Sequence, residues 1–310
     1  MKVVVIGAGA MGSLFGGLLA EAGNNVRLLD IWPEHVAAIN AGGLFVERAG
    51  KTRTIPVQAL TDPAEAGPVD LAVVFVKSAH TADAAHTAAA LAGKSGIVLT
   101  LQNGLGNADI LARIAATATV VAGTTAHGAT LLAPGRIRHA GVGPTTIGRW
   151  SGEDSDAVDR VAEVFNQAGI ETEVAVDVRR VIWEKLIVNV GINAITALTG
   201  IKNGQILDLE TTRELSRAAV EEAVAVAAAR GVTIREDAAE HVLAVARATA
   251  ANRSSMGQDV DHGRRTEIDA INGAVVREAE MVGIPVPVNR TLADLVVTLE
   301  THYPPAGTDP

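Results

Sequence analysis

The sequence predicts an α/β protein in which an N-terminal, doubly wound parallel sheet is followed by an all-helical C-terminal domain. Short apolar runs alternate with helical patterns over residues 1–175, as they do in parallel βαβ units. A glycine-rich turn follows the first apolar run and opens the first helical pattern. From Asp177 onward the pattern is helical almost throughout, without a convincing strand. We therefore expect two domains, residues 1–175 and 176–310.

The composition is that of a globular chain with an ordinary core, since 48% of the 310 residues are hydrophobic and 20% are charged. The net charge of −9 argues against a nucleic-acid partner, because neutralising phosphates requires clustered Lys and Arg. The absence of cysteine excludes disulfides and thiolate metal sites, and we expect no bound metal. The first apolar run is too short for a signal peptide, and no stretch offers about 18 consecutive apolar residues. We therefore expect a cytoplasmic protein without a membrane partner.

The glycine-rich turn lies between an apolar strand, expected over residues 3–6, and a helix expected over 13–22. Gly7, Gly9 and Gly12 have the G-x-G-x-x-G spacing of a dinucleotide-binding loop. The first glycine allows the tight turn, the second lets a pyrophosphate approach the backbone, and the third lets helix and strand pack closely. The positive end of the helix then faces the phosphates. We expect a Rossmann domain whose loop contacts to the cofactor are Gly7, Ala8, Gly9, Ala10, Met11 and Gly12.

A second strand, expected over residues 25–29, ends at an acidic residue, Asp30. A carboxylate about 20 residues after the glycine loop hydrogen-bonds the ribose hydroxyls of NAD. The same carboxylate would repel the 2′-phosphate of NADPH, and the chain has no arginine after Asp30 until Arg48. Asp30 therefore favours NADH over NADPH as the NAD(P)H cofactor. Whether the side chain of Arg27, which lies within the strand, reaches a 2′-phosphate is left open.

The remaining elements continue these two patterns. Strands are expected over 70–77, 96–104, 119–128, 139–148 and 171–176, with two short strands around a turn at Ala49–Gly50. Helices of the first domain are expected over 33–41, 81–91, 108–115 and 156–168. Helices of the second domain are expected over 178–197, 209–230, 234–252, 265–281 and 285–301, and residues 304–310 are expected to form a disordered tail.

One expected helix carries three polar residues on a single face. Lys185, Asn189 and Asn193 follow one another at intervals of four residues, and each step advances about 40° around a helix. The other faces of this helix are apolar. A lysine and two asparagines are unfavourable to bury unless a polar group meets them. The pattern favours a cleft for a polar ligand with Lys185 as proton donor, and the alternative is a solvated stripe on an amphipathic helix.

Ser255 and Glu267 are further candidates near the C-terminal end. Asn252, Ser255 and Asp259 are spaced to share a helical face, and Glu267 opens the next helical pattern. Ser255 could hydrogen-bond a substrate carboxylate or hydroxyl, or it could be a capping or surface serine. Glu267 could bind a hydroxyl of the cofactor or substrate, or it could complement the dipole of the helix that follows.

Three histidines, His80, His127 and His139, lack the spacing of metal ligands and have no carboxylate partner placed by the sequence. We expect His127 to support the site from a neighbouring position and the other two to be structural. The sequence contains no nucleophile elbow, P-loop or zinc motif.

Four stretches together resemble the ketopantoate reductase (2-dehydropantoate 2-reductase) family. They are GAGAMGS in the first turn, QNGLG around Asn103, EKLIVNVGINAITALTG around Lys185 and SSMGQDV…GRRTEIDAINGAVV around Glu267. The resemblance covers essentially the whole chain in the right order. It implies hydride transfer from NAD(P)H to C2 of a 2-oxo acid, most specifically 2-dehydropantoate, to give a D-2-hydroxy acid. It also implies that Lys185 is the general acid that stabilises and protonates the developing oxyanion.

The resemblance implies the remaining site residues as well. The substrate contacts that it implies are Asn103, Asn189, Asn193, Asn203 and Ser255. The cofactor contacts that it implies beyond the glycine loop are Lys77, Asn103, Ala129 and Glu267. The expected partner is a small 2-oxo acid, and the apolar helical domain could support a homodimer.

Three alternatives stay open. NAD-linked members of the superfamily resemble D-2-hydroxy acid dehydrogenases that act on branched or aromatic 2-oxo acids, including mandelate-type enzymes, and the segment LLDIWPEHVAAINAGGL looks more like that branch. A non-catalytic protein that senses the dinucleotide would have no need of Lys185. A 3-hydroxy acid dehydrogenase also uses a Lys and an Asn on one helix turn, but it lacks the SSM…TEID stretch.

Overall fold

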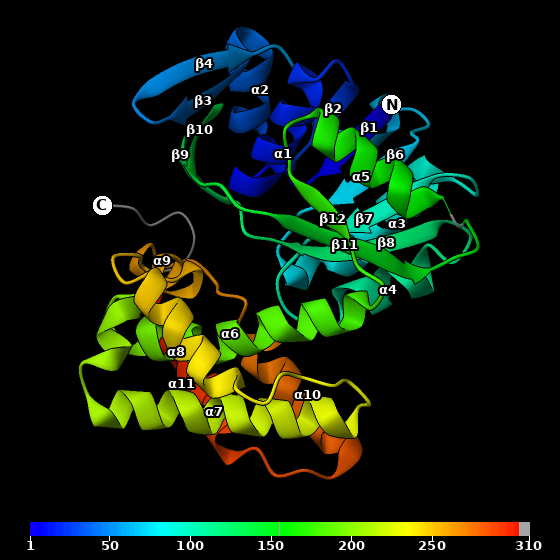
Figure 1. Cartoon of the computed structure of the whole chain (residues 1–310). Coiled ribbons are helices and arrows are strands. Elements are labelled where there is room, and N and C mark those ends of the chain that lie inside the picture. The colour runs from blue at the N-terminus through cyan, green and yellow to red at the C-terminus, as the bar shows by residue number, and fades with distance from the viewer. Residues whose placement is uncertain (155, 304–310) are drawn as a thin grey trace. The chain divides into compact units, whose positions relative to one another are not determined.

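The computed structural model of the chain describes residues 1–154 and 156–303, so the tail expected at 304–310 lies outside the described residues. The chain divides into two compact units, which can be followed by colour in Figure 1. The N-terminal unit consists of residues 1–102 and 106–181, and the C-terminal unit consists of residues 103–105 and the chain from Ile182 onward. The expected α/β class is confirmed, while the domain limits 1–175 and 176–310 stay a prediction.

An eight-stranded sheet forms the centre of the N-terminal unit. Its strands are β1 (Lys2–Ile6), β2 (Asn25–Leu29), β5 (Gln58–Leu60), β6 (Leu71–Val74), β7 (Ile97–Thr100), β8 (Thr119–Thr125), β11 (Thr145–Ser151) and β12 (Thr172–Val174). Their order is β12-β11-β8-β7-β6-β1-β2-β5, and every neighbouring pair is parallel except β11 with β8. The strands run outward in both directions from β1, which makes the sheet doubly wound, as expected.

Helices cover both faces of this sheet (Figure 1). The helices of the unit are α1 (Ala10–Glu21), α2 (Pro33–Gly42), α3 (Thr81–Ala92), α4 (Asn107–Ile114) and α5 (Ala157–Gln167). Successive side chains of a strand point to opposite faces, so Val3 and Val5 pack in one core with α1 and α5, while Val4 and Ile6 pack in another with α3 and α4. A strand covered on both faces must be apolar throughout, which explains the continuous apolar run of β1.

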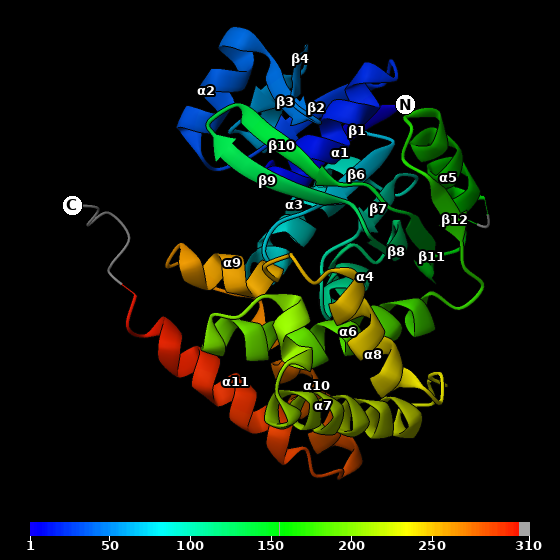
Figure 2. The same ribbon diagram turned by 60° about the vertical axis from the view of Figure 1, so that its left-hand side comes forward.

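A second sheet of four strands packs against α1, as Figure 2 shows. It has the order β4-β3-β10-β9 and contains β3 (Leu44–Arg48), β4 (Lys51–Ile55), β9 (Gly128–Ala133) and β10 (Arg136–Gly141). Gly17 of α1 permits this contact, because a Cβ there would lie 2.9 Å from Cδ2 of Leu44 and 3.2 Å from Cδ1 of Ile55. Since α1 lies between two sheets, most of its residues are buried.

Several boundaries in this unit differ from the sequence-based expectation. The first helix begins at Ala10 rather than Ser13, so Gly12 lies inside it. The strand expected over 139–148 is in fact two strands of different sheets, β10 and β11, and an unexpected strand, β9, pairs with β10. The break occurs at Pro144, which has no N–H to donate to a sheet. The edge strand β5 was also not expected, because three residues are too few to form a pattern.

The C-terminal unit is helical over its described residues. Its helices are α6 (Val178–Thr199), which belongs to this unit from Ile182 onward, α7 (Glu210–Ala229), α8 (Ala238–Ala248), α9 (Ser255–Asp261), α10 (Asn272–Val282) and α11 (Pro287–Glu300), with short 3₁₀ turns η3 (Asn203–Leu207) and η4 (Ile268–Ala270). Leu186, Val190 and Ala194 of α6 are buried in the common core. The helix expected over 234–252 is shorter, and α9 begins separately because the Ser254 hydroxyl accepts the N–H of Gly257 at 2.9 Å. The helix expected over 265–281 begins only with α10.

α6 is long and apolar enough to cross a membrane by length and composition alone. However, 61% of its most apolar 18-residue window is buried inside the protein. Packing within the protein therefore accounts for this composition.

Candidate active site

The turn from β1 into α1 is built by close backbone contacts around an open space. Gly7 has φ of +90°, and a Cβ on it would lie 2.7 Å from the backbone nitrogen of Val76. A Cβ on Gly12 would lie only 1.9 Å from the carbonyl oxygen of Gly7. At Gly9, in contrast, no atom lies within 4 Å of where a Cβ would be. The turn is thus tightly packed on its inner side and open at Gly9.

The same open space meets the uncapped N-terminus of α1. Gly9 is the residue that precedes the helix, and no side chain caps the first turn. The first N–H groups of a helix lack partners within the helix, and its dipole is positive at this end. Space at Gly9 together with these N–H groups fits the pyrophosphate of a dinucleotide. The residues present therefore fit NAD(P)H as a cofactor.

Asp30 and the glycine loop both lie at the carboxyl ends of the strands of the main sheet. β1 and β2 are parallel, with Ile6 opposite Leu29, and the N–H of Gly7 donates to the carbonyl oxygen of Leu29 at 2.8 Å. The carboxylate of Asp30 accepts a hydrogen bond from the N–H of Trp32 at 3.0 Å. This contact turns the carboxylate toward the start of α2 and fixes it just beyond β2.

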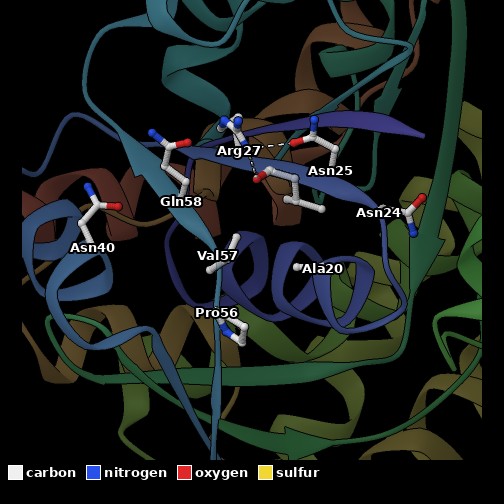
Figure 3. A pocket seen from close by; sticks show the side chains of 9 residues that line it. Ala20, Asn24, Asn25, Arg27, Asn40, Pro56, Val57 and Gln58 are labelled. Atoms are coloured by element: carbon white, nitrogen blue, oxygen red, sulfur yellow. Dashed lines mark hydrogen bonds between the residues drawn. The ribbon is translucent and has the colours of Figure 1, made fainter.

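Arg27 is directed toward the other end of β2. Its Nη1 donates to Oδ1 of Asn25 at 2.8 Å and to the carbonyl oxygen of Val26 at 3.3 Å. The side chain lines a hollow of about 420 Å³. Figure 3 shows it there together with Asn24, Asn25 and Gln58. This hollow lies at the amino ends of β2 and β5, whereas Asp30 follows the carboxyl end of β2. The Arg27 side chain, whose reach the sequence left open, therefore extends away from Asp30.

Lys77 and Ala129 lie on separate segments of the N-terminal unit. Lys77 is exposed and precedes a short 3₁₀ turn, η2 (Ser78–His80), that follows β6. Ala129 is half-buried in β9. Gln102, which was not predicted from the sequence, joins the segments that follow β6 and β7. Its Nε2 donates to the carbonyl oxygen of Val76 at 2.7 Å and to Oγ1 of Thr81 at 2.9 Å.

His127 and His139 form a buried pair that spacing in the sequence could not reveal. Nδ1 of His127 is hydrogen-bonded to Nε2 of His139 at 3.1 Å, and the His127 ring packs edge-on against Phe15. Burial lowers the pKa of both rings, and the positive charge of Arg48 lowers it further. The two neutral rings thus bridge β10 and the segment before β9. A role for His127 in support of the site stays a prediction.

Lys185, Glu267 and Asn103 come together in the C-terminal unit from three distant segments. Glu267 immediately precedes η4, and its Oε2 accepts a hydrogen bond from Nδ2 of Asn103 at 3.2 Å. Burial lowers the pKa of Lys185 to about 8, and the negative charge of Glu267 opposes that shift. A lysine with such a pKa is protonated at neutral pH yet can release its proton, as a general acid must.

The position of Asn103 corrects the strand expected over 96–104. β7 ends at Thr100, and residues 103–105 belong to the C-terminal unit. The N–H of Leu105 donates to the carbonyl oxygen of Ala270 at 2.9 Å. Gly104 has φ of +84°, and a Cβ on it would lie 2.2 Å from that same carbonyl oxygen, so the approach requires glycine. This close contact holds Asn103 next to Glu267.

Asn193 and Ser255 bring α6 and α9 together. Nδ2 of Asn193 lies 3.4 Å from Oγ of Ser255, and Asn193 is buried while Ser255 is exposed. Asn189, one turn earlier on α6, makes no side-chain hydrogen bond within the part of the chain that the structure describes. Asn252 lies before α9, so the expectation that it shares a helical face with Ser255 and Asp259 was wrong.

Asn203 is buried with one unsatisfied acceptor. Its Nδ2 donates to Oγ1 of Thr249 at 3.0 Å, and only 8% of the residue is exposed. Its Oδ1 has no hydrogen-bond partner among the described residues. An unsatisfied buried acceptor is unfavourable by about 1–3 kcal/mol.

Comparison with known proteins finds matches to both halves of the chain. A family model described as ketopantoate reductase PanE/ApbA matches residues 3–152, and one described as the C-terminal part of ketopantoate reductase PanE/ApbA matches residues 177–300. A curated relative from Halobacterium salinarum, named 2-dehydropantoate 2-reductase, is 46% identical over 297 residues. The alignment covers 96% of this chain and 98% of that protein.

Two solved structures resemble the fold over nearly its full length. A PanE/ApbA family ketopantoate reductase from Ralstonia eutropha has a TM-score of 0.90 at 38% identity and covers 97% of this chain and 99% of its own. A ternary structure of D-mandelate dehydrogenase with NADH and anilino(oxo)acetate also has a TM-score of 0.90, at 28% identity, and covers 97% and 99%.

We expect Gly9→Ala to weaken cofactor binding and Gly12→Ala to lower the stability of the fold. A methyl group at Gly9 meets no protein atom, so it leaves the melting temperature unchanged but occupies the space open to pyrophosphate. We expect the Kd for NADH to rise about tenfold or more, a loss of roughly 1.4 kcal/mol. A methyl group at Gly12 meets the carbonyl oxygen of Gly7 and lowers the melting temperature. Thermal unfolding measures the melting temperature, and NADH fluorescence titration measures the Kd. Unchanged NADH affinity in Gly9→Ala would contradict the assignment of this loop to the cofactor.

Proposed function

Since the chain belongs to the ketopantoate reductase family, we propose that it reduces 2-dehydropantoate to pantoate with NAD(P)H. Membership confirms the resemblance drawn from the motifs, and it makes the protein an NAD(P)-dependent oxidoreductase that acts on a CH–OH group. The observation that carries the proposal is the meeting of Lys185, Glu267 and Asn103: burial lowers the pKa of the lysine to about 8, and the charge of Glu267, which accepts a hydrogen bond from Asn103, opposes that shift.

The reaction adds a hydride to C2 of the 2-oxo acid and a proton to its carbonyl oxygen. A bound dihydronicotinamide supplies the hydride. As negative charge develops on the carbonyl oxygen, the ammonium group of Lys185 stabilises that charge and donates the proton. The charge of Glu267 helps to keep Lys185 protonated before the reaction, and Asn103 holds the Glu267 carboxylate through its amide. Lys185 is left neutral and is reprotonated from solvent.

Amide and hydroxyl groups of the C-terminal unit would hold the rest of the substrate. Asn189, Asn193 and Ser255 can donate hydrogen bonds to a carboxylate. Asn203, the remaining substrate contact that the resemblance implies, is buried and its Oδ1 is enclosed by protein, so Asn189, Asn193 and Ser255 carry this part of the proposal.

We propose NADH as the preferred cofactor; the proposal is supported by Asp30, whose carboxylate follows the end of β2 beside the glycine loop at the spacing of a residue that bonds the adenosine ribose. Arg27 is directed toward the opposite end of β2, which supports the same preference. The solved D-mandelate dehydrogenase was bound to NADH, which fits an NAD-linked alternative acting on aromatic 2-oxo acids. That neighbour is 28% identical, against 46% for the curated 2-dehydropantoate 2-reductase, so the alternative is the weaker proposal.

A cytoplasmic location and a homodimer, both expected from the sequence, belong to the same proposal. Metal is not part of it, since proton donation and charge stabilisation come from Lys185.

Turnover tests the proposed reaction and the role of Lys185 together. We expect oxidation of NADH, followed at 340 nm, to be faster with 2-dehydropantoate than with branched or aromatic 2-oxo acids. Lys185→Ala removes the proton donor, so kcat falls by about 10²–10⁴ while the Kd for NADH is unchanged. Lys94→Ala, an exposed lysine, serves as the control. Faster turnover of an aromatic 2-oxo acid would favour the dehydrogenase alternative, and tight NADH binding without any turnover would favour a sensor.

The rate of reduction depends on pH through Lys185. Below pH 8 the lysine is protonated and can donate, whereas above about pH 8 it is neutral, so kcat/KM for reduction falls as pH rises through that value. Oxidation of pantoate requires the neutral lysine and rises over the same range. Glu267→Gln removes the charge that opposes the effect of burial, so the midpoint moves to lower pH. Glu280→Gln, at an exposed glutamate, is the control, and equal midpoints in the two variants would refute the pairing.

The cofactor preference depends on Asp30. We expect wild-type kcat/KM to be higher with NADH than with NADPH. Asp30→Asn removes the charge that repels the 2′-phosphate and weakens the hydrogen bonds to the ribose, so the NADH-to-NADPH ratio falls by about tenfold or more. Asp62→Asn, at an exposed aspartate of the same unit, should leave the ratio unchanged. A strong NADPH preference of the wild type would overturn this part of the proposal.

A further inference from the structure

Arg253, just before α9, binds the ends of two helices in the C-terminal unit. Its Nε and Nη2 donate to the two carboxylate oxygens of Asp261, the last residue of α9, both at 2.8 Å. Its Nη1 donates to the carbonyl oxygens of Thr196 and Ile201, the latter at 2.9 Å, at the C-terminal end of α6. Only 17% of the arginine side chain is exposed. A cation at this end of α6 also complements the helix dipole.

A second contact joins the same two segments. The hydroxyl of Ser254 caps α9 and is hydrogen-bonded to the hydroxyl of Thr196 at 2.7 Å. Both residues are buried, with Thr196 fully enclosed. Ser255 is the next residue along the chain. Its position relative to α6 is therefore determined by the contacts of Arg253 and Ser254.

Gly257 leaves the space that the guanidinium of Arg253 occupies. A Cβ on Gly257 would lie 2.6 Å from both Cζ and Nη1 of Arg253. The guanidinium of Arg253 therefore occupies space that a side chain at residue 257 would enter. An exposed ion pair between flexible side chains contributes little to a structure. This arginine instead is packed against backbone, bidentate to Asp261 and bonded to two carbonyl groups, which makes its geometry well defined.

We propose that Arg253 is a positioning residue for the substrate contacts Asn193 and Ser255. These two residues lie on the two helices that Arg253 joins, with their side chains 3.4 Å apart. Without Arg253, the first turn of α9 could shift relative to α6, and a displacement of about 1 Å in a substrate-positioning group can reduce catalysis by about 10²-fold. The inference rests on the proposed function, since it concerns the residues proposed to bind the 2-oxo acid.

Steady-state kinetics of Arg253→Met test the inference. Methionine keeps an apolar stem but removes all four hydrogen bonds of the guanidinium. We expect the KM for 2-dehydropantoate to rise about tenfold or more, while the KM for NADH stays within twofold of wild type, roughly 0.4 kcal/mol or less. Gly257→Ala pushes the guanidinium aside from the opposite direction and should raise the same KM. Arg290→Met, which removes an exposed ion pair with Glu280 (2.7 Å), is the matched control and should change neither KM.

The outcomes separate a positioning role from a purely structural one. A structural arginine would lower the melting temperature and the amount of active enzyme without raising the KM for 2-dehydropantoate, and that result overturns the inference. Should Arg253→Met fail to fold, Arg253→Lys answers the same question, because lysine keeps the charge but cannot reach all four acceptors, so a rise in this KM is again expected. An inactive wild type overturns the proposed function and the inference with it. An active wild type with unchanged KM in the variants overturns the positioning role alone.

Discussion

The C-terminal unit must accommodate the ammonium group of Lys185 on α6, a helix that forms part of its apolar core. α6 supplies much of the apolar core of that unit, so Lys185 is drawn into surroundings that disfavour its charge. The charge of Glu267 compensates in part, and Glu267 is in turn bonded to Asn103. Three segments far apart in the sequence must therefore meet at one point. The balance between burial and the opposite charge leaves the lysine able to exchange a proton near neutral pH.

Backbone contacts that only glycine allows hold the surrounding segments in place. In the N-terminal unit, Gly12 packs against the carbonyl group of Gly7, which brings the start of α1 onto the end of β1. In the C-terminal unit, Gly104 packs against the carbonyl group of Ala270, which fixes the neighbouring Asn103. Backbone is less mobile than side chains. Groups attached directly to these contacts are consequently well positioned for binding and catalysis.

Features set by short-range geometry could be predicted from the sequence, whereas features set by distant contacts could not. The glycine loop, Asp30 and the face shared by Lys185, Asn189 and Asn193 all follow from spacing within one or two elements. The transfer of residues 103–105 to the C-terminal unit depends on Ala270, more than 160 positions later in the chain. Arg253 was missed for the same reason, because the carbonyl groups that it binds lie 57 and 52 residues earlier.

The residues proposed for cofactor preference and for proton transfer belong to different units. Asp30 belongs to the N-terminal unit, while Lys185 and Glu267 belong to the C-terminal unit. In the proposed assignment, a carboxylate at the end of β2 changes the affinity for the ribose, whereas the pKa of Lys185 is shifted by burial and by the charge of Glu267. An NADH preference would therefore not count against ketopantoate reduction, and the substrate must be judged from the residues of the C-terminal unit.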